Sequence, residues 1–245
     1  MALSDFAVRF RDTMPGAYAN AFSDADVEEH AQIAQGASAG APCVVVWRTL
    51  PQGMVILCVV AEDRPGLVAL VSASFVAHAL DVRSAQIYCR TSPSGQLEAV
   101  DFFWLRNVAG GLPDAERLRA CRLTILALLG NAAPPGTGEA HAAARNEMSG
   151  AGTQYIANVS YAPDPSAAEH WEIALEAHDF PGLLHTVARL LHDHGLEVLR
   201  CEIRTEDGVA RDRFQVACFT GAPAQPQLEA FRNALLGVIN AVRQC

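Results

Sequence analysis

The chain has 245 residues, about half of them apolar, and a formal net charge of −9. This length suffices for two domains of ordinary size, and the apolar content excludes disorder of the whole chain. The negative charge argues against a general nucleic-acid binder, and no apolar run approaches the roughly 20 residues of a membrane span. Seven cysteines, an odd number without a CxxC pair, predict no disulfide framework and favour a reducing cytoplasm.

Residues 1–42 form a leader ahead of the first strand pattern. Ser23 precedes two acidic residues and can cap a short helix. One face of that helix is expected to carry Val27, His30, Ala31 and Ala34. The stretch 36–42, rich in Gly, Ala and Pro, then indicates a flexible link. Because the leader has no cluster of polar residues, we interpret it as a packing arm.

Two apolar runs open the next part of the chain. They lie at 43–47 and 54–61, and a Pro/Gly turn between them predicts a β-hairpin. A second turn, at 62–67, ends the latter run. This turn opens an amphipathic helix expected over 67–80.

Further elements follow that helix. Strands are expected at 81–90 and 97–105, and a helix at 112–129. The region 130–152 has few large apolar residues and is the best candidate for a linker. A strand at 155–161 could then close a first unit in the order βαββαβ.

The turn at 63–67, Asp-Arg-Pro-Gly-Leu, has a second copy at 179–183, Asp-Phe-Pro-Gly-Leu; from Pro65 to Pro181 the offset is 116 positions. The elements around it also return. They are a strand at 171–176, a helix at 183–194, strands at 196–205 and 209–219, and a closing helix at 226–242. We therefore interpret the chain as one module used twice, the second copy lacking a fourth strand of its own.

A downstream match strengthens the repeat, because Asp101 and Phe103 align with Asp212 and Phe214. This Asp-x-Phe pattern, with the Asp-x-Pro-Gly-Leu turn, resembles the ACT domain pair. A more specific likeness is to the C-terminal ACT region of the bacterial PII-protein uridylyltransferase/uridylyl-removing enzyme family. That family also has a Met-Pro-x-x-Tyr stretch, similar to residues 14–18 here, and the likeness covers nearly the whole chain.

The resemblance implies an α+β fold of two ferredoxin-like βαββαβ domains, with antiparallel sheets and helices on one face, behind a helical leader at 1–42. We expect the first domain at 43–161 and the second at 168–245. The resemblance also implies that the turns bind small effectors, often amino acids, and that the uridylyltransferase family senses glutamine there. The family's nucleotidyltransferase and phosphohydrolase motifs are not evident, so no catalytic residue, metal or cofactor is predicted.

Each turn precedes a helix, where free amides and the helix dipole favour a carboxylate. Gly66 and Gly182 let a ligand approach the backbone closely, and Asp63 and Asp179 offer an anion for an ammonium group. The alternative is that the aspartates merely cap the helices. The second copy has Phe180 in place of Arg64, so the first turn is the stronger candidate. The ligand-binding candidates are Asp63, Arg64, Gly66, Leu67, Gln86, Asp179, Gly182, Leu183 and Glu202.

Phe102 and Trp104 are expected on the sheet face away from the helices, a face that would not remain uncovered. The leader, another sheet or a second chain should cover it. The alternative is tandem packing of the two repeats within the chain.

The function indicated is a cytoplasmic regulatory module that binds an amino-acid effector in nitrogen or amino-acid metabolism. It would act as a homodimer or on a regulated protein partner, without nucleic acid or membrane. Two alternatives stay open: a non-catalytic fragment or remnant of a PII uridylyltransferase, and a purely structural dimerisation module.

Overall fold

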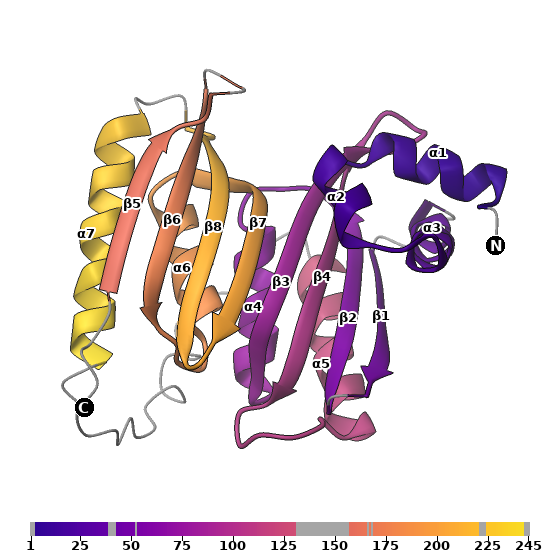
Figure 1. Ribbon diagram of the computed structural model, residues 1–245, viewed down its shortest axis with the longest axis horizontal. Helices are drawn as coiled ribbons and strands as arrows, with labels where there is room; N and C mark the ends of the chain where they lie inside the picture. The colour runs from indigo at the N-terminus through magenta and orange to yellow at the C-terminus, as the bar shows by residue number, and fades with distance from the viewer. Residues whose placement is uncertain are drawn as a thin grey trace.

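The computed structural model describes residues 3–38, 43–51, 53–130, 157–165, 167, 169–220 and 224–242. These residues form an α+β fold (Figure 1). The leader contains α1 (Asp5–Thr13), α2 (Gly16–Ala21) and α3 (Asp24–Ser38). The first repeat contains β1 (Cys43–Leu50), β2 (Met54–Glu62), α4 (Leu67–Ala77), β3 (Leu80–Thr91), β4 (Leu97–Asn107) and α5 (Ala115–Gly130). The second contains β5 (Ala157–Pro163), β6 (His170–His178), α6 (Leu183–Asp193), β7 (Leu196–Glu206), β8 (Val209–Cys218) and α7 (Ala224–Val242).

All eight strands belong to one antiparallel sheet in the order β1-β2-β4-β3-β7-β8-β6-β5. The two repeats meet edge to edge at its centre, where β3 pairs with β7 from Ser84↔Arg204 to Ile87↔Cys201. The order of elements therefore reads the same from either edge of the sheet (Figure 1). Each half is compatible with a ferredoxin-like unit, joined to the other as a continuous sheet rather than face to face.

The strand at 157–163 corrects the predicted division of the chain. It pairs with β6, from Ala157↔Ala177 to Pro163↔Trp171, and does not close the first repeat. The place beside β2 is already taken by the upstream β1, through pairs from Cys43↔Ala61 to Leu50↔Met54. The second repeat consequently has a fourth strand, contrary to expectation, and residues 157–161 pair with that repeat. Except for Gly130, the predicted linker lies outside the described residues, as do residues 155–156.

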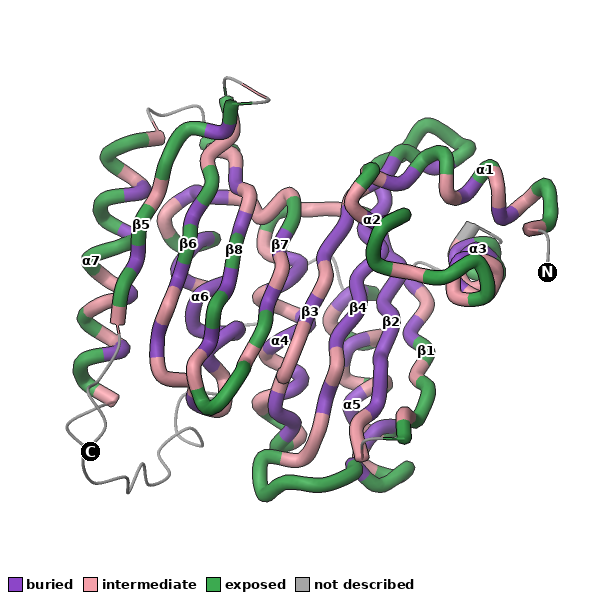
Figure 2. Tube along the Cα trace, in the orientation of Figure 1, coloured by how far each residue is buried: buried purple, intermediate pink, exposed green. Residues whose placement is uncertain are grey.

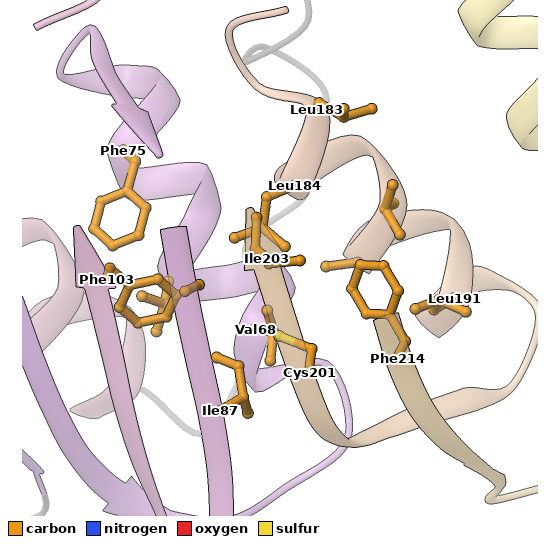
Figure 3. Packing of buried hydrophobic residues seen from close by; sticks show 14 of the residues in the cluster. Val68, Phe75, Ile87, Phe103, Leu183, Leu184, Leu191, Cys201, Ile203 and Phe214 are labelled. Carbon is orange, nitrogen blue, oxygen red and sulfur yellow. The ribbon is translucent and has the colours of Figure 1, made fainter. Parts of the chain in front are cut away.

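Helices cover the two sheet faces differently. The helices α4 to α7 lie on one face, where they bury an apolar core that is continuous through both repeats; Figure 3 shows part of it, including Phe75, Phe103 and Phe214. The leader packs on the opposite face of the first repeat only, against residues such as Phe102. The expectation that this face is covered is confirmed, and within the chain the cover is the leader.

The burial of the strands records this difference. In β2 every residue from Val55 to Ala61 is buried, as expected for a strand covered on both faces. In β8 the burial alternates, and exposed Arg211 and Arg213 flank buried Asp212. Figure 2 shows exposed residues alternating along β6 and β8, whereas β2 and β4 are mostly buried.

Candidate ligand sites at the junction of the repeats

Both glycine turns adopt the same local structure. Gly66 and Gly182 are the N-cap residues of α4 and α6, with φ of 82° and 88°, a left-handed conformation that favours glycine. Neither helix has a side-chain cap at this end. Asp63 and Asp179 therefore do not cap the helices, and the capping interpretation is wrong. Their carboxylates lie instead in two small cavities at the turns.

Each turn packs against the other repeat. A Cβ on Gly66 would lie 3.0 Å from Nδ1 of His192 in α6, and one on Gly182 would lie 3.3 Å from a Cγ of Val76 in α4. The helices α4 and α6 are in contact with each other behind the central strands (Figure 1). Glycine is needed at both turns because the opposite helix approaches the backbone so closely.

The cavity at the first turn, here called the first site, is lined by three carboxylates: Asp63, Asp101 and Glu197. Asp101 is fully buried, and neither of its oxygens has a hydrogen-bond partner of normal geometry. Burial and the nearby Asp63 raise the pKa of Asp101 well above its usual range, while the backbone N–H of Tyr88 offsets a smaller part. Burial and Asp63 also raise the pKa of Glu197. Ionising all three carboxyl groups of this site at neutral pH is therefore unfavourable.

The cavity at the second turn, the second site, has carboxylates in the matching positions: Asp179, Asp212 and Asp81. Burial and the nearby Asp81 raise the pKa of Asp179 to about 6, against a lowering by Arg83. Burial raises the pKa of Asp212 to about 8, although its Oδ1 accepts a 3.3 Å hydrogen bond from the backbone N–H of Arg204. The two sites thus share a triad of carboxylates contributed by both repeats.

Both sites are narrow. Each leaves a cavity volume of about 20 Å³, room for about one water molecule. At the first site Arg64 extends away from the carboxylates, with Nη2 3.4 Å and 3.5 Å from the carbonyl oxygens of Leu128 and Leu129. An amino acid could enter only if side chains such as that of His192 moved.

The structure brings most of the predicted residues together. Asp63, Arg64, Gly66 and Leu67 line the first site, and Asp179, Gly182 and Leu183 line the second. Gln86 and Glu202 line neither site. They face each other across the β3–β7 junction, Gln86 accepting a 2.9 Å hydrogen bond from the Tyr88 hydroxyl and Glu202 pairing with Arg204. Successive side chains of a strand point to opposite faces of the sheet. Gln86 and Glu202 alternate with the residues that point to the helices, so both lie on the face away from the helices.

Several site residues were missed from the sequence. Asp101 and Asp212 were recognised as repeat partners but not as members of the sites. Asp81, His192 and Glu197 were missed because each belongs to the repeat opposite the turn that it faces. The signal available was the repeat itself, since the same offset relates Asp81 to Glu197. No group of three or more His, Cys, Asp or Glu suited to a metal ion occurs among the described residues.

The paired repeats and their turns resemble an ACT domain pair. In agreement, the chain is 35% identical over 72 residues to the ACT domain-containing protein ACR6 of Arabidopsis thaliana, covering 29% of this chain and 17% of that protein. The match to a second kind of protein is longer. The chain is 29% identical over 234 residues to the bifunctional uridylyltransferase/uridylyl-removing enzyme of Phenylobacterium zucineum, covering 93% of this chain and 24% of the enzyme.

The corresponding enzyme of Caulobacter vibrioides is 28% identical over 234 residues, covering 92% of this chain and 24% of the enzyme. The predicted resemblance to this enzyme is thereby confirmed over nearly the whole chain. The chain spans about a quarter of the length of these curated relatives. No family model matches the chain. Among the described helices, none is long and apolar enough to cross a membrane.

Proposed function

We propose that the chain is a non-catalytic regulatory module that binds an amino acid, glutamine being the first candidate, where the two repeats meet. The carrying observation is that each glycine turn packs against the opposite repeat, Gly66 against His192 and Gly182 against Val76. A ligand at a turn would touch both repeats. It would therefore bind one arrangement of the repeats better than another, which is the requirement for regulation.

The chemistry of the first site supports an amino acid as the ligand. The first turn of α4 contributes Val68 and Ala69 to the lining, and amides in such a turn have no partner within the helix. They suit a carboxylate, as the helix dipole does. Asp63 and Asp101 suit an ammonium group. A zwitterion satisfies both halves of the site.

The likeness to uridylyltransferase/uridylyl-removing enzymes supports the wider role. We propose that this region reports amino-acid supply, in nitrogen metabolism and in the cytoplasm, to a catalytic partner. That partner would be another part of a longer polypeptide or a separate protein. The match covers only about a quarter of those enzymes, so their activity is not transferred to this chain.

One observation favours an alternative. The volume of about 20 Å³ at each turn is far too small for an amino acid, as expected if the turns only pack the repeats together. On this alternative the chain is a structural module without a ligand. The two functions differ in whether side chains at the first site move enough to admit an amino acid.

Calorimetric titration with a panel of amino acids, glutamine first, separates them. We expect heat from at least one amino acid and a rise in melting temperature with the same compound. Gly66→Val should abolish both signals, because its side chain would enter the space beside His192. Gly95→Val is the control, since Gly95 also has a positive φ but faces open space. Folded protein that gives neither signal with any amino acid would support the structural alternative.

A further inference from the structure

The two sites differ at the residue that bulges from the central strands. The register of β3 shifts between Val82 and Ser84, and that of β7 shifts between Val198 and Arg200. A β-bulge leaves its extra residue out of the ladder and redirects its side chain. These extra residues are Arg83 in the first repeat and Leu199 in the second, which occupy the same place in the repeat.

In the second site the bulge residue supplies a cation. Arg83 reaches across the junction, and its Nη1 lies 2.7 Å from Oδ2 of Asp179 and 3.6 Å from Oδ2 of Asp81. Its Nη2 donates to the backbone carbonyl of Thr205 at 3.4 Å. The Arg83 side chain is 20% exposed, so the guanidinium is largely withdrawn from water together with the carboxylates that it pairs with. Two of the three carboxylates of this site are therefore paired with a cation from within the chain.

In the first site the bulge residue supplies no charge. Leu199 lines the cavity beside Asp63, Asp101 and Glu197, and no ion pair joins these carboxylates to a cation among the described residues. Arg64 is directed to the carbonyl oxygens at the end of α5.

Asp101 makes this more than a cluster of acidic residues. Its side chain is fully buried, lines the cavity and has no hydrogen-bond partner of normal geometry for either oxygen. A buried carboxylate without a partner is costly, and a bound cation would remove the cost. The corresponding Asp212 accepts a hydrogen bond from the Arg204 amide and lines the second site, whose other two carboxylates pair with Arg83.

We propose that the bulge residue decides which site accepts a ligand: Arg83 fills the cation position of the second site, and the first site binds the cationic group of a ligand between Asp63, Asp101 and Glu197. This rests on the proposed function in one respect, that the cationic group is the ammonium of an amino acid. One amino acid then binds per chain, at the first site. The second site stays closed and holds the repeats together through the ion pair of Arg83 with Asp179.

Exchanging the bulge residues tests the proposal. The variants are Arg83→Leu, Leu199→Arg and the double variant, each checked for folding by circular dichroism. The probes are methylguanidinium, which matches the vacated head group of Arg83, and glutamine. Arg106→Leu is the matched control, because Arg106 pairs with Asp81 at 3.0 Å and, in the described part of the chain, forms no ion pair with Asp179.

In Arg83→Leu we expect methylguanidinium at millimolar concentration to restore several degrees of lost melting temperature, whereas an equal concentration of sodium should not. Arg106→Leu should show no rise beyond the one that binding at the first site gives the parent protein. Leu199→Arg should lower the affinity of the first site for either probe at least tenfold. In the double variant, binding should move to the second site, as seen from chemical shifts of residues near Asp179.

Two results would overturn the proposal: an Arg83→Leu protein with no selective methylguanidinium rescue, or a folded Leu199→Arg protein with unchanged binding at the first site. If Leu199→Arg fails to fold, the rescue of Arg83→Leu decides alone. Selective rescue without binding of any amino acid by the parent protein would refute amino-acid sensing and leave the role of Arg83 intact. Binding of an amino acid by the parent protein without rescue of Arg83→Leu would support amino-acid sensing and refute the role given to Arg83.

Discussion

The hydroxyl of Tyr18, on α2, lies 2.7 Å from Nδ1 of His30, on α3, in the buried layer between the leader and the sheet. The ring of His30 also packs on Phe102 of β4, with ring centroids 4.2 Å apart. Neutral imidazole can accept the hydroxyl proton at Nδ1, whereas imidazolium cannot. One hydrogen bond thus joins two leader helices directly above the sheet, and it depends on His30 remaining neutral.

The first prediction concerns pH. Burial lowers the pKa of His30 from 6.5 to about 4. The unfolded chain therefore binds a proton at higher pH than the folded chain, and stability that is complete above pH 6.5 is lost as the pH falls toward 4. We expect the melting temperature to fall over this range, and His30→Gln to flatten the fall, because glutamine can accept the hydrogen bond without titrating. Thermal denaturation at half-unit steps of pH measures it.

Tyr18→Phe is the control for that experiment. It removes the hydroxyl and leaves the acceptor of His30 unsatisfied, at a cost of about 1–3 kcal/mol, but His30 stays buried. Its stability should therefore be lower near neutral pH while the fall toward acid pH persists. An equal pH dependence in the parent protein and His30→Gln would refute the role given to His30.

Helical spacing in the leader was sufficient to predict the buried face of Val27, His30, Ala31 and Ala34, which the structure confirms. The pairing of β5 could not be predicted in this way. An edge strand joins either repeat with the same local pattern, and only competition with β1 decides its place.

The candidate site was predicted in part for a related reason. The turn residues carry their own signal, since Pro fixes φ and Gly allows a positive φ. The opposite wall of each site comes from the other repeat, so Glu197 and Arg83 acquire their roles only from the edge-to-edge union of β3 and β7. The buried state of Asp101 likewise depends on residues of both repeats, distant in the sequence, which no local pattern encodes.

The second prediction concerns the stabilisation that the leader gains by packing on the sheet. Phe102 is fully buried and its ring centroid lies 4.6 Å from that of Phe22. Phe102→Ala should lower the free energy of unfolding by about 3–5 kcal/mol. Arg213 holds the matching position on the uncovered face of the second repeat, and Arg213→Ala should change it by only about 0.5 kcal/mol. Urea unfolding compares the two, and similar losses would show that the leader adds no burial energy.

The third prediction separates backbone strain from crowding at the first turn. Gly66 and Gly95 have φ of 82° and 83°, so an alanine at either position costs about 1–2 kcal/mol in backbone strain. Only at Gly66 does the new Cβ meet a neighbour, His192 Nδ1 at 3.0 Å. We expect Gly66→Ala to be the more destabilising in urea, and His192→Ala to remove the difference. Equal losses for the two glycines would show that the imidazole moves aside freely.

The fourth prediction follows from the buried carboxyl of the second site. Burial, together with the nearby Asp179, raises the pKa of Asp212 to about 8. The folded chain therefore holds a proton that the unfolded chain releases near pH 4, so the stabilising effect is complete below pH 4 and is lost as the pH rises through 8. Asp212→Asn keeps an oxygen for the Arg204 amide and carries no charge. It should unfold at a higher temperature than the parent protein at pH 9, with the advantage vanishing at pH 4.

A single pKa unit corresponds to about 1.4 kcal/mol, so even a quarter of the rise at Asp212 would be measurable as a shift in melting temperature. Asp114→Asn supplies a contrast of opposite sign. Asp114 is exposed at the start of α5, and the hydrogen bond from the backbone N–H of Arg117, 2.8 Å long, lowers its pKa. Its charge therefore favours folding above pH 4, and its removal should reduce stability there rather than raise it. If both variants lose stability at pH 9, a cation compensates the ionised carboxylate of Asp212 in the folded protein. Protonation of Asp212 would then be refuted.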